Sequence, residues 1–589
     1  MNRRDFIQAL SSTTLGAALT SRVVTGAPPG RDRRPNVVLI LTDDQGYGDL
    51  SCHGNPVLRT PHLDALYSAS ARLTDFHVDA VCAPTRAALL TGRYSSRVGV
   101  WHTIMGRSLL WQDEVTMADV FRHNGYRTGI FGKWHLGDNR PYRPEDRGFD
   151  EVLVLGGGAI GNTPDHWGND YFDDTYCHNG QWKRFPGYCT DVFFDRAIDF
   201  IRRCGDQPFF AYVATNTPHW PHQVAEEYAA PYRGKVPDRR ATFYGMIANI
   251  DSNVGRLRRF LREAGLEDNT ILIFMTDNGT SFGAEFDERE HVKEGYNAGM
   301  RGCKGSVLDG GHRVPCFLRW PRGGIGGGVD VPELAAHIDL LPTLIDLCAL
   351  RTPDGPGLDG RSLRAALTGS GQPLDPRVLL VHNQRVDLPI KGKDFAVMTP
   401  QWRLVRQALY DIRRDPGQRE DLSTRRPDVV DVLSDAYERW WTEISAHFDD
   451  YPTIPVGTSY DEVVPLTSHD VHGQVVWDQS QVRRNARCDG FWAIDVAARG
   501  LYEVELRRWP IEADLAITSA PAGATAMKAT HARLRVGSAD LIRPLREGDK
   551  AARFEVRLDR QKTRLQGWFV DGRENGAVNC PFYAYLRRR

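Results

Sequence analysis

An alternation of short, continuously apolar runs with helical segments restricts the fold of this chain more than any other feature of its sequence. A run that is apolar at every position fits a strand covered on both faces, as strands in a parallel sheet are. Val37–Leu41 is a run of this kind, and Thr128–Phe131, Phe209–Val213, Ile271–Met275 and Pro315–Trp320 are similar. The helical segments between them are Val115–Asn124, Asp191–Arg203 and Ala241–Ala264. The pattern predicts an α/β domain over residues 31–375, with a large, mostly parallel central sheet flanked by helices.

The pattern changes twice beyond this region. Stretches rich in Pro, Gly and Asp at 353–360 and 369–376 lead into residues 376–450, which predict a smaller α+β subdomain with strands in 395–405 and a helix over 427–448. Residues 451–457 have the composition of a linker. Over residues 458–589, apolar and charged residues alternate without intervening helices, for example in Leu501–Trp509 and Arg553–Leu558. Strands with one solvated face predict an added antiparallel β-sandwich.

The N-terminus has the pattern of an export signal. Paired arginines at positions 3 and 4 are followed by Phe6, an apolar run to Leu19 and small residues up to Ala27. This order predicts a twin-arginine signal peptide over residues 1–30, with the Tat export machinery as a partner and a periplasmic or extracellular location. A disordered cytoplasmic tail is the alternative interpretation.

Charge and cysteine content disfavour several classes of protein. The 74 basic and 75 acidic residues balance, so nothing favours nucleic acid or an anionic membrane surface as a partner. No run approaches the roughly 20 apolar residues of a membrane span. The ten cysteines show neither a C-x-x-C pair nor a zinc-type spacing. Most are expected to be buried apolar residues, although Cys177 and Cys189 could form a disulfide in an oxidising compartment.

Polar residues follow four of the apolar runs at the point where each run ends. Asp43 and Asp44 follow the first run, and Asp277 and Asn278 follow the run that ends at Met275. The groups that follow the other two runs are Lys133, Trp134, His135 and His219. Because ligands bind outside the carboxyl ends of parallel strands, we expect these groups at one edge of the sheet. Helix capping would explain either acidic pair alone, but together they offer an all-oxygen ligand set that suits calcium or magnesium rather than zinc.

The segment Cys82-Ala-Pro-Thr-Arg86 places a thiol and a guanidinium one helical turn apart. Pro84 suits the first turn of a helix, and Thr91-Gly92 would end it. Residues one turn apart share a face, so Cys82 and Arg86 would face the same small volume. The helix N-terminus and the nearby cationic groups would form a natural anion site.

Together with Leu90-Thr-Gly-Arg93, this segment resembles the signature of the type I sulfatases, within the alkaline-phosphatase-like superfamily. The resemblance runs from about Asn36 to Phe448 and includes, in order, Gly132–Gly137, Thr217–His219, Thr276–Gly279 and Arg301–Gly305. The predicted sandwich lies outside this match and resembles an ancillary module of some bacterial members. The sandwich could bind carbohydrate, or it could have a packing or dimer role; we favour packing.

The resemblance implies a role for each motif residue. It implies that a formylglycine-generating enzyme oxidises Cys82 to Cα-formylglycine, whose hydrated aldehyde attacks the sulfur of a sulfate ester and later releases sulfate. The implied ligands of one calcium ion are Asp43, Asp44, Asp277, Asn278 and the modified residue 82. Arg86 would brace the diol, Asp277 would help to activate it, and His135 would take the proton that allows its collapse. The sulfate would be bound by Lys133, Lys304 and His219, of which the last two would also supply a proton to the leaving oxygen.

We therefore predict an exported, calcium-dependent sulfatase that acts on a sulfated carbohydrate or an aryl sulfate. The substrate is expected to approach over Trp134, Trp220 and His222, although tryptophans beside such motifs are also common packing residues. A formylglycine-dependent phosphonate or phosphodiester hydrolase is the alternative that the sequence leaves open. A cysteine-dependent phosphatase is disfavoured because it needs a wider spacing between cysteine and arginine. A non-catalytic binding protein is disfavoured because every expected charged position is filled.

Overall fold

The computed structural model describes residues 34–370, 374–572 and 576–589, and the chain from Pro35 onward forms one compact unit. The predicted export signal, residues 1–30, lies outside the described residues. Among the helices of the described segments, none combines the length and the apolar character that crossing a membrane requires.

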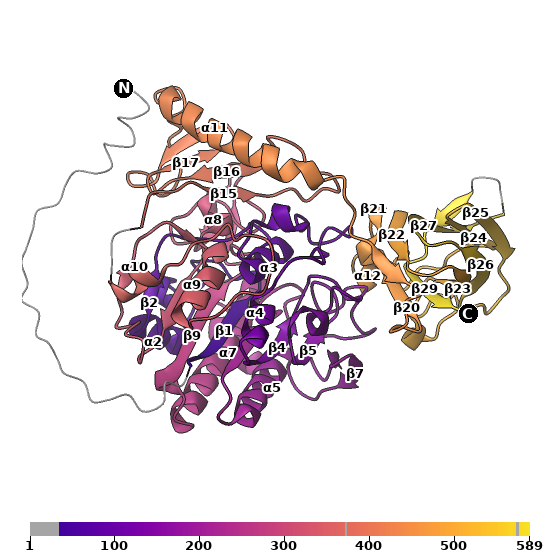
Figure 1. The fold of residues 1–589 in the computed structure, drawn as a ribbon, viewed down its shortest axis with the longest axis horizontal. Coiled ribbons are helices and arrows are strands. Elements are labelled where there is room, and N and C mark those ends of the chain that lie inside the picture. The colour runs from indigo at the N-terminus through magenta and orange to yellow at the C-terminus, as the bar shows by residue number, and fades with distance from the viewer. Residues whose placement is uncertain (1–33, 371–373, 573–575) are drawn as a thin grey trace, which may run out of the picture. The chain divides into compact units, whose positions relative to one another are not determined.

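A ten-stranded, mostly parallel sheet forms the centre of the predicted α/β domain, residues 31–375, as the apolar runs predicted (Figure 1); this domain, to which the sequence resemblance assigns the reaction, is called the catalytic region below. Its parallel core has the order β9-β1-β8-β4-β5, and the antiparallel strands β12, β6 and β7 lie toward its edges. The core strands are β1 (Asn36–Thr42), β4 (Arg127–Lys133), β5 (Glu151–Leu155), β8 (Phe209–Ala214) and β9 (Thr270–Thr276). The outer strands are β2 (Ala71–Leu73), β6 (Thr175–His178), β7 (Gln181–Arg184), β12 (Cys316–Arg319) and β13 (Asp330–Val331).

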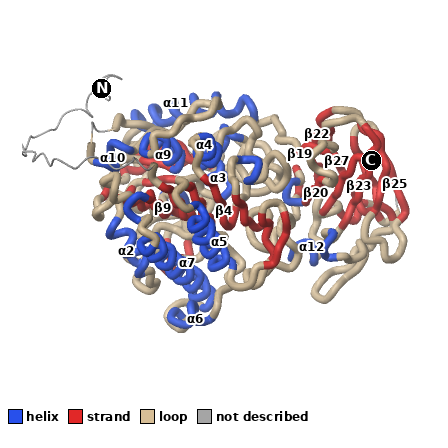
Figure 2. Tube along the Cα trace, turned by 60° about the horizontal axis from the view of Figure 1, so that its bottom comes forward, coloured by secondary structure: helices blue, strands red, loops and turns tan. Residues whose placement is uncertain are grey.

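Helices cover both faces of this sheet, and alternate residues of β1 therefore pack into two different cores. Val37, Leu39 and Leu41 belong to a core shared with α3 (Cys82–Thr91), α4 (Met117–His123) and α9 (Leu340–Leu347). Val38 and Ile40 belong to a second core, shared with α2 (Pro61–Ala69), α5 (Cys189–Cys204) and α7 (Asp238–Glu263). Figure 2 shows the two helical layers on either side of the strands. This arrangement explains why Val37–Leu41, the middle of β1, is apolar at every position.

A smaller antiparallel sheet follows, with strands β15 (Leu379–His382), β16 (Phe395–Met398), β17 (Trp402–Val405) and β18 (Ala408–Asp411). Helix α11 (Pro427–Ile444) packs on it, with the ring of Tyr437 stacked on Phe395 at a centroid distance of 4.0 Å. The catalytic region also contains two strand pairs, β3 (Phe76–His77) with β14 (Ala335–Ala336) and β10 (Ala284–Phe286) with β11 (Val292–Gly295), and the short helices α6 (Glu226–Ala229), α8 (Asp309–His312) and α10 (Arg364–Thr368).

The C-terminal region is a β-sandwich, as its alternating pattern predicted. One sheet contains β19 (Ile454–Val456), β21 (His472–Gln474), β22 (Asp489–Val496), β24 (His531–Val536), β25 (Ala539–Pro544), β27 (Gln561–Val570) and β28 (Ala577–Asn579). The other has the order β20 (Val464–Thr467), β29 (Tyr583–Arg588), β23 (Gly500–Arg507) and β26 (Ala552–Leu558). A short helix, α12 (Gln479–Arg483), lies between β21 and β22.

One feature of the sandwich differs from the sequence-based expectation, and a second fits the favoured packing role. Residues 454–456 of the expected linker form β19, which pairs in parallel with β22 at the edge of the sheet. The sandwich core also includes Leu109 and Tyr142 from the catalytic region. The Tyr142 hydroxyl donates a hydrogen bond to the carbonyl oxygen of Thr453 at 2.8 Å, and the Asn139 amide donates to that of Pro465 at 2.7 Å. The sandwich is therefore packed against the catalytic region rather than tethered by a free linker.

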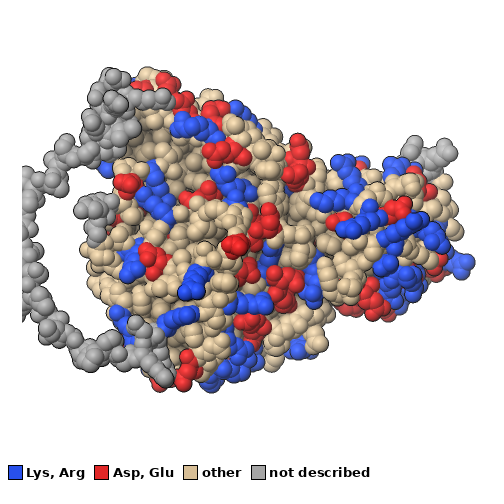
Figure 3. Space-filling model, in the orientation of Figure 1, with Lys and Arg blue, Asp and Glu red and all other residues tan. Residues whose placement is uncertain are grey.

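The surface charges match the balanced composition. In the view of Figure 3, acidic and basic side chains are interspersed over the catalytic region, and Lys and Arg gather over the sandwich. All ten cysteines lie in the described segments and none of them forms a disulfide, so Cys177 and Cys189 are free thiols.

Candidate active site

The carboxyl ends of the parallel strands bring the predicted polar residues together. Asp43 follows β1 and Asp277 follows β9, and the two strands are in register up to the Thr42–Thr276 pair. The backbone N–H of Asp277 donates to the carbonyl oxygen of Thr42 at 3.0 Å, which fixes the two aspartates side by side. Lys133 is the last residue of β4, the strand that pairs with β8 on the side away from β5. The sheet edge is thus a scaffold for one polar cluster.

Three buried carboxylates in this cluster are each paired with a different cation. Lys133 Nζ lies 2.7 Å from Asp43 Oδ2, and both side chains are fully buried. Lys304 Nζ lies 2.6 Å from Asp44 Oδ1, and Arg86 Nη2 lies 2.8 Å from Asp277 Oδ2. Because an isolated buried charge is very unfavourable, this one-to-one pairing allows three carboxylates to share a small volume.

Two oxygen atoms of the cluster have no hydrogen-bond partner among the described residues. They are Asp43 Oδ1 and Asn278 Oδ1, and both residues are fully buried. Ligand oxygens of Asp43, Asp44 and Asp277 lie within 4.8 Å of one another. Buried polar atoms are nearly always hydrogen-bonded, so oxygens that converge without a donor fit a site for a hard cation.

Cys82 begins the helix that the sequence predicted. It is the first residue of α3, preceded by Val81 in an extended conformation, and Gly92 ends the helix with a left-handed backbone. Arg86, one turn later, donates two hydrogen bonds to Asp277 Oδ2 and one to the carbonyl oxygen of Lys133 at 3.0 Å. Burial raises the pKa of the Cys82 thiol, despite the charges of Lys133 and Lys304. The unmodified thiol is therefore held in its protonated, weakly nucleophilic form.

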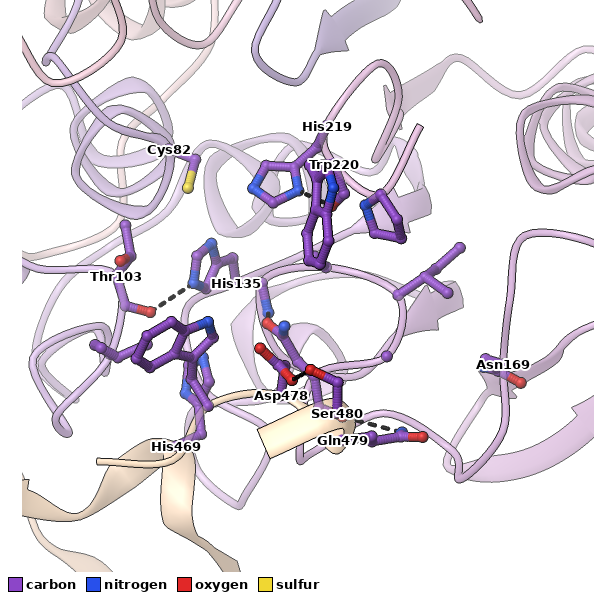
Figure 4. A pocket seen from close by; sticks show the side chains of 18 of the residues that line it. Cys82, Thr103, His135, Asn169, His219, Trp220, His469, Asp478, Gln479 and Ser480 are labelled. Carbon is purple, nitrogen blue, oxygen red and sulfur yellow. Dashed lines mark hydrogen bonds between the residues drawn. The ribbon is translucent and has the colours of Figure 1, made fainter. Parts of the chain in front are cut away.

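The two predicted histidines lie beside Cys82 and have their tautomers set by backbone carbonyls. His135 Nε2 lies 2.8 Å from the Thr103 carbonyl oxygen, so this nitrogen carries the proton and Nδ1 is left without a partner among the described residues. His219 Nδ1 lies 2.5 Å from the carbonyl oxygen of Trp220, which leaves Nε2 facing Asp44 Oδ2 at 3.7 Å. Figure 4 shows both rings close to Cys82.

Burial and nearby charges keep both histidines neutral at pH 7. Burial and the charge of Lys133 lower the pKa of His135 well below 6.5, and burial and Lys304 lower that of His219 to about 3. Burial and the neighbouring Asp43 raise the pKa of Asp277 to about 6. Burial alone would raise the pKa of Asp44, but the charge of Lys304 outweighs it and the pKa is lowered.

A cavity of about 840 Å³ opens next to this cluster. Cys82, His135, His219 and Lys304 line its inner part, and Trp220, whose side chain is 45 % exposed, lines it farther out. A volume of this size accommodates a small organic substrate rather than a sulfate-sized ion alone. The cavity thus connects the reactive groups to a larger binding space.

Two of the three residues expected along the substrate path do not line this cavity. Trp134 is 2 % exposed, its Nε1 donates to the carbonyl oxygen of Tyr142 at 2.9 Å, and its ring packs edge-on against Phe149. His222 packs against the ring of Phe282 at a centroid distance of 4.3 Å. Trp134 is a packing residue because its polar tip and its ring both find partners in the core.

The cavity also contains residues that the sequence analysis did not single out. The Thr103 carbonyl orients His135, and the Tyr171 hydroxyl donates to the carbonyl oxygen of His219 at 3.0 Å. His469, from the sandwich, lines the cavity with its ring 5.8 Å from that of His135. A backbone carbonyl gives no signal in a sequence, and His469 lies in a region without a motif.

Comparisons with known proteins show which family this chain is similar to. A model of the sulfatase family matches residues 35–349. Human arylsulfatase A is 33 % identical over 463 residues, which cover 68 % of this chain and 86 % of that protein. The N-acetylgalactosamine-6-sulfatase of the dog is 27 % identical, with 72 % and 86 % of the two chains covered.

Solved structures give the same result for the fold. The structure of Ps i-CgsB in complex with k-i-k-neocarrahexaose is similar with a TM-score of 0.61 and 29 % identity, covering 69 % of this chain and 92 % of that one. The phosphonate monoester hydrolase of Agrobacterium radiobacter is similar with a TM-score of 0.51 and 23 % identity, covering 70 % and 96 %. At that identity the second similarity concerns the fold alone.

Proposed function

Because this chain belongs to the sulfatase family and is a hydrolase of sulfate esters, we propose that it is an exported, calcium-dependent sulfatase whose nucleophile is a formylglycine made from Cys82. One observation carries the proposal. Cys82 lines the cavity at the first turn of α3, and the paired carboxylates of Asp43, Asp44 and Asp277 lie within 4.8 Å of one another in the same cluster. The twin-arginine pattern supports export.

Calcium is the cation that best fits the oxygen-only ligand set. Asp43, Asp44, Asp277 and Asn278 would hold it, together with residue 82, and the unpartnered oxygens of Asp43 and Asn278 support this assignment. When bound, the ion supplies positive charge that stabilises negative charge on the sulfate oxygens. Since the three carboxylates are already balanced by three cations, the added charge favours an anionic substrate.

Conversion of Cys82 to formylglycine would supply a hydrated aldehyde with one hydroxyl to attack sulfur and a second to release sulfate. The protonated state of the buried thiol supports this need for a different nucleophile. Arg86 orients the site through its bonds to Asp277 and to the Lys133 carbonyl.

The histidine and lysine side chains would handle protons and sulfate. His135 can accept a proton at Nδ1, because the Thr103 carbonyl holds the N–H on Nε2. Lys304 remains charged, because the charge of Asp44 raises its pKa against the effect of burial, and it lies in the cavity wall, where it would bind the sulfate. His219 is neutral without substrate, and a bound sulfate would raise its pKa and allow it to donate at Nε2. Lys133 would assist sulfate binding through its buried positive charge.

A sulfated carbohydrate or an aryl sulfate is the substrate class that we propose. The exposed ring of Trp220 at the cavity offers an apolar face to a sugar or aryl group. The names of the similar proteins, an arylsulfatase, an N-acetylgalactosamine-6-sulfatase and a protein solved with neocarrahexaose, support the same class.

Mass spectrometry combined with kinetics tests the proposal. Protein co-produced with a formylglycine-generating enzyme should show loss of one sulfur and two hydrogen atoms and gain of one oxygen at residue 82, and it should hydrolyse 4-nitrophenyl sulfate with multiple turnovers. Cys82→Ala should be inactive, whereas Cys52→Ala, at a half-buried cysteine that does not line the cavity, should retain activity. Full turnover by homogeneous, unmodified protein would overturn the mechanism. Faster turnover of a phosphonate monoester or a phosphodiester than of any sulfate ester would overturn the proposed substrate class.

A further inference from the structure

The sandwich forms one wall of the active-site cavity. The cavity is lined by Trp477, Asp478 and Arg483, which lie at and beside α12. Cys82 and His219 line the same cavity, although they precede Trp477 by about 400 and about 260 residues. Figure 4 shows Asp478, Gln479 and Ser480 across the cavity from Cys82. The strand ends of the catalytic region therefore supply only part of the cavity.

Gln479 fixes this wall to the catalytic region. Its side-chain amide Nε2 lies 3.2 Å from each of the carbonyl oxygens of Asn162, Asp165 and His166, and its Oε1 accepts from the Gly168 N–H at 2.9 Å. Its backbone N–H donates to the Gly161 carbonyl at 2.8 Å. Because this side chain is nearly fully buried and joins one loop at several points, the loop and α12 are held as one rigid element.

Trp477 and Asp478, which precede Gln479, are also bonded to this loop of the catalytic region. The Thr163 N–H donates to the carbonyl oxygen of Trp477 at 2.9 Å, and Asn162 and Asp478 form an isolated β-bridge. Asp478 caps α12 by accepting from the Gln481 N–H at 2.9 Å. With its backbone held in this way, Trp477 keeps its side chain at the cavity, where it is 42 % exposed. A large exposed aromatic ring held by a fixed backbone is a feature of binding sites.

Cationic and polar groups accompany this ring. Arg483 stacks on Trp167 at 4.8 Å, and Arg385 of the smaller subdomain also lines the cavity. Within the described residues, neither guanidinium is paired with a carboxylate. His469 is 2 % exposed, and neither of its ring nitrogens has a hydrogen-bond partner in the described part of the chain. Arginines that lack a carboxylate partner, in a cavity that also has an exposed aromatic ring, favour an anionic ligand with flat apolar faces.

We propose that the sandwich binds the sugar unit next to the one that carries the scissile sulfate, with Trp477 stacking on that sugar and Arg483 pairing with an anionic substituent on it. This inference rests on the proposed sulfatase function and adds that the substrate is an oligosaccharide with more than one negative charge. Trp220 and Trp477 would contact successive sugars, because one lines the cavity from the catalytic region and the other from the sandwich. The sandwich is then part of the substrate site rather than a packing module.

Kinetics with substrates of increasing length test this proposal. 4-Nitrophenyl sulfate would report the sulfate site, and sulfated mono-, di- and tetrasaccharides of the chondroitin and carrageenan types would be measured as substrates and as competitors of it. We expect affinity to rise about tenfold from mono- to disaccharide, the gain of one stacked ring and one ion pair. Trp477→Ala and Arg483→Gln should each remove most of that gain, and the Arg483 contribution should decrease with added salt.

Matched controls come from the same region. Arg484→Gln changes an exposed arginine at the C-terminal end of α12 that does not line the cavity, and Trp568→Ala changes a half-buried tryptophan on β27. Both should keep the gain with length. The inference is overturned if wild type hydrolyses 4-nitrophenyl sulfate but shows no gain with length, or if Trp477→Ala keeps the whole gain. In either case the proposed function stands, whereas absence of any sulfatase turnover in formylglycine-containing wild type overturns both.

Discussion

Replacement of Arg86 by methionine should destabilise the region around α3 by about 4 kcal/mol. The side chains of Arg86 and Asp277 are both 0 % exposed, and their closest atoms lie 2.8 Å apart. The substitution would leave a buried carboxylate without its cation, which costs about 3–5 kcal/mol. It would also leave the Lys133 carbonyl without the donor that lies 3.0 Å away. The removal of the Asp277 charge in the double variant Arg86→Met/Asp277→Asn should restore a large part of the loss, because no unpaired carboxylate then remains.

Hydrogen–deuterium exchange of peptides from α3 and β9 in chelator-treated protein, over a urea series, would measure this local free energy of unfolding. Lys550→Met provides the control, because Lys550 and its partner Asp514 are 47 % and 74 % exposed. An exposed pair of this kind contributes less than about 1 kcal/mol. If Arg86→Met lost no more stability than Lys550→Met, or if the double variant were no more stable than Arg86→Met, the pairing argument for the site would be refuted.

Three further predictions concern the metal, the position of His135 and acid stability. Removal of calcium with a chelator should abolish turnover of 4-nitrophenyl sulfate, and calcium should restore it; full activity in protein shown by elemental analysis to be metal-free would contradict the assignment. Gly158→Ala should lower kcat at least about tenfold with little change in Tm, because the added Cβ would lie 2.3 Å from the His135 ring, whereas Gly357→Ala, with no atom within 4 Å, should change neither. Burial lowers the pKa of His382 from 6.5 to about 3, so its neutral form stabilises the fold fully above about pH 6.5, and this contribution is lost as the pH falls toward 3. Urea unfolding of His382→Phe should therefore depend less on pH between 7 and 5 than that of wild type, by up to about 1.4 kcal/mol per pH unit, and equal slopes would contradict the assignment.

The inner part of the candidate site could be located from the sequence because its residues follow strands whose order is visible as apolar runs. Asp43 and Asp277 directly follow such runs, and the parallel register then places them side by side. Cys82 and Arg86 lie within one helix, so their mutual position needs only helical periodicity. In both cases, local pattern was sufficient.

The outer part could not be located in this way. Trp477 and His469 reach the cavity because the sandwich bonds segments more than 300 residues earlier. These bonds run through Gln479 and through the His469 carbonyl, which accepts from the Met105 N–H, and no local pattern encodes these contacts. Trp134 follows Lys133 directly, but its neighbours in the sequence do not reveal that Tyr142 and Phe149 enclose it. The stretch that includes Pro455 has the composition of a linker, yet it forms β19, since an edge strand tolerates a residue without an N–H.

Because each carboxylate of the site is paired with a cation, folding of the protein does not depend on metal binding. A metal site made only of carboxylates repels itself until its ion arrives, so folding must wait for the metal, as it does in small zinc domains. Here Lys133, Lys304 and Arg86 already pair with Asp43, Asp44 and Asp277, so the chain can fold without a bound metal ion. Under the proposed function, calcium would then bind after export, as the last step before the enzyme becomes active.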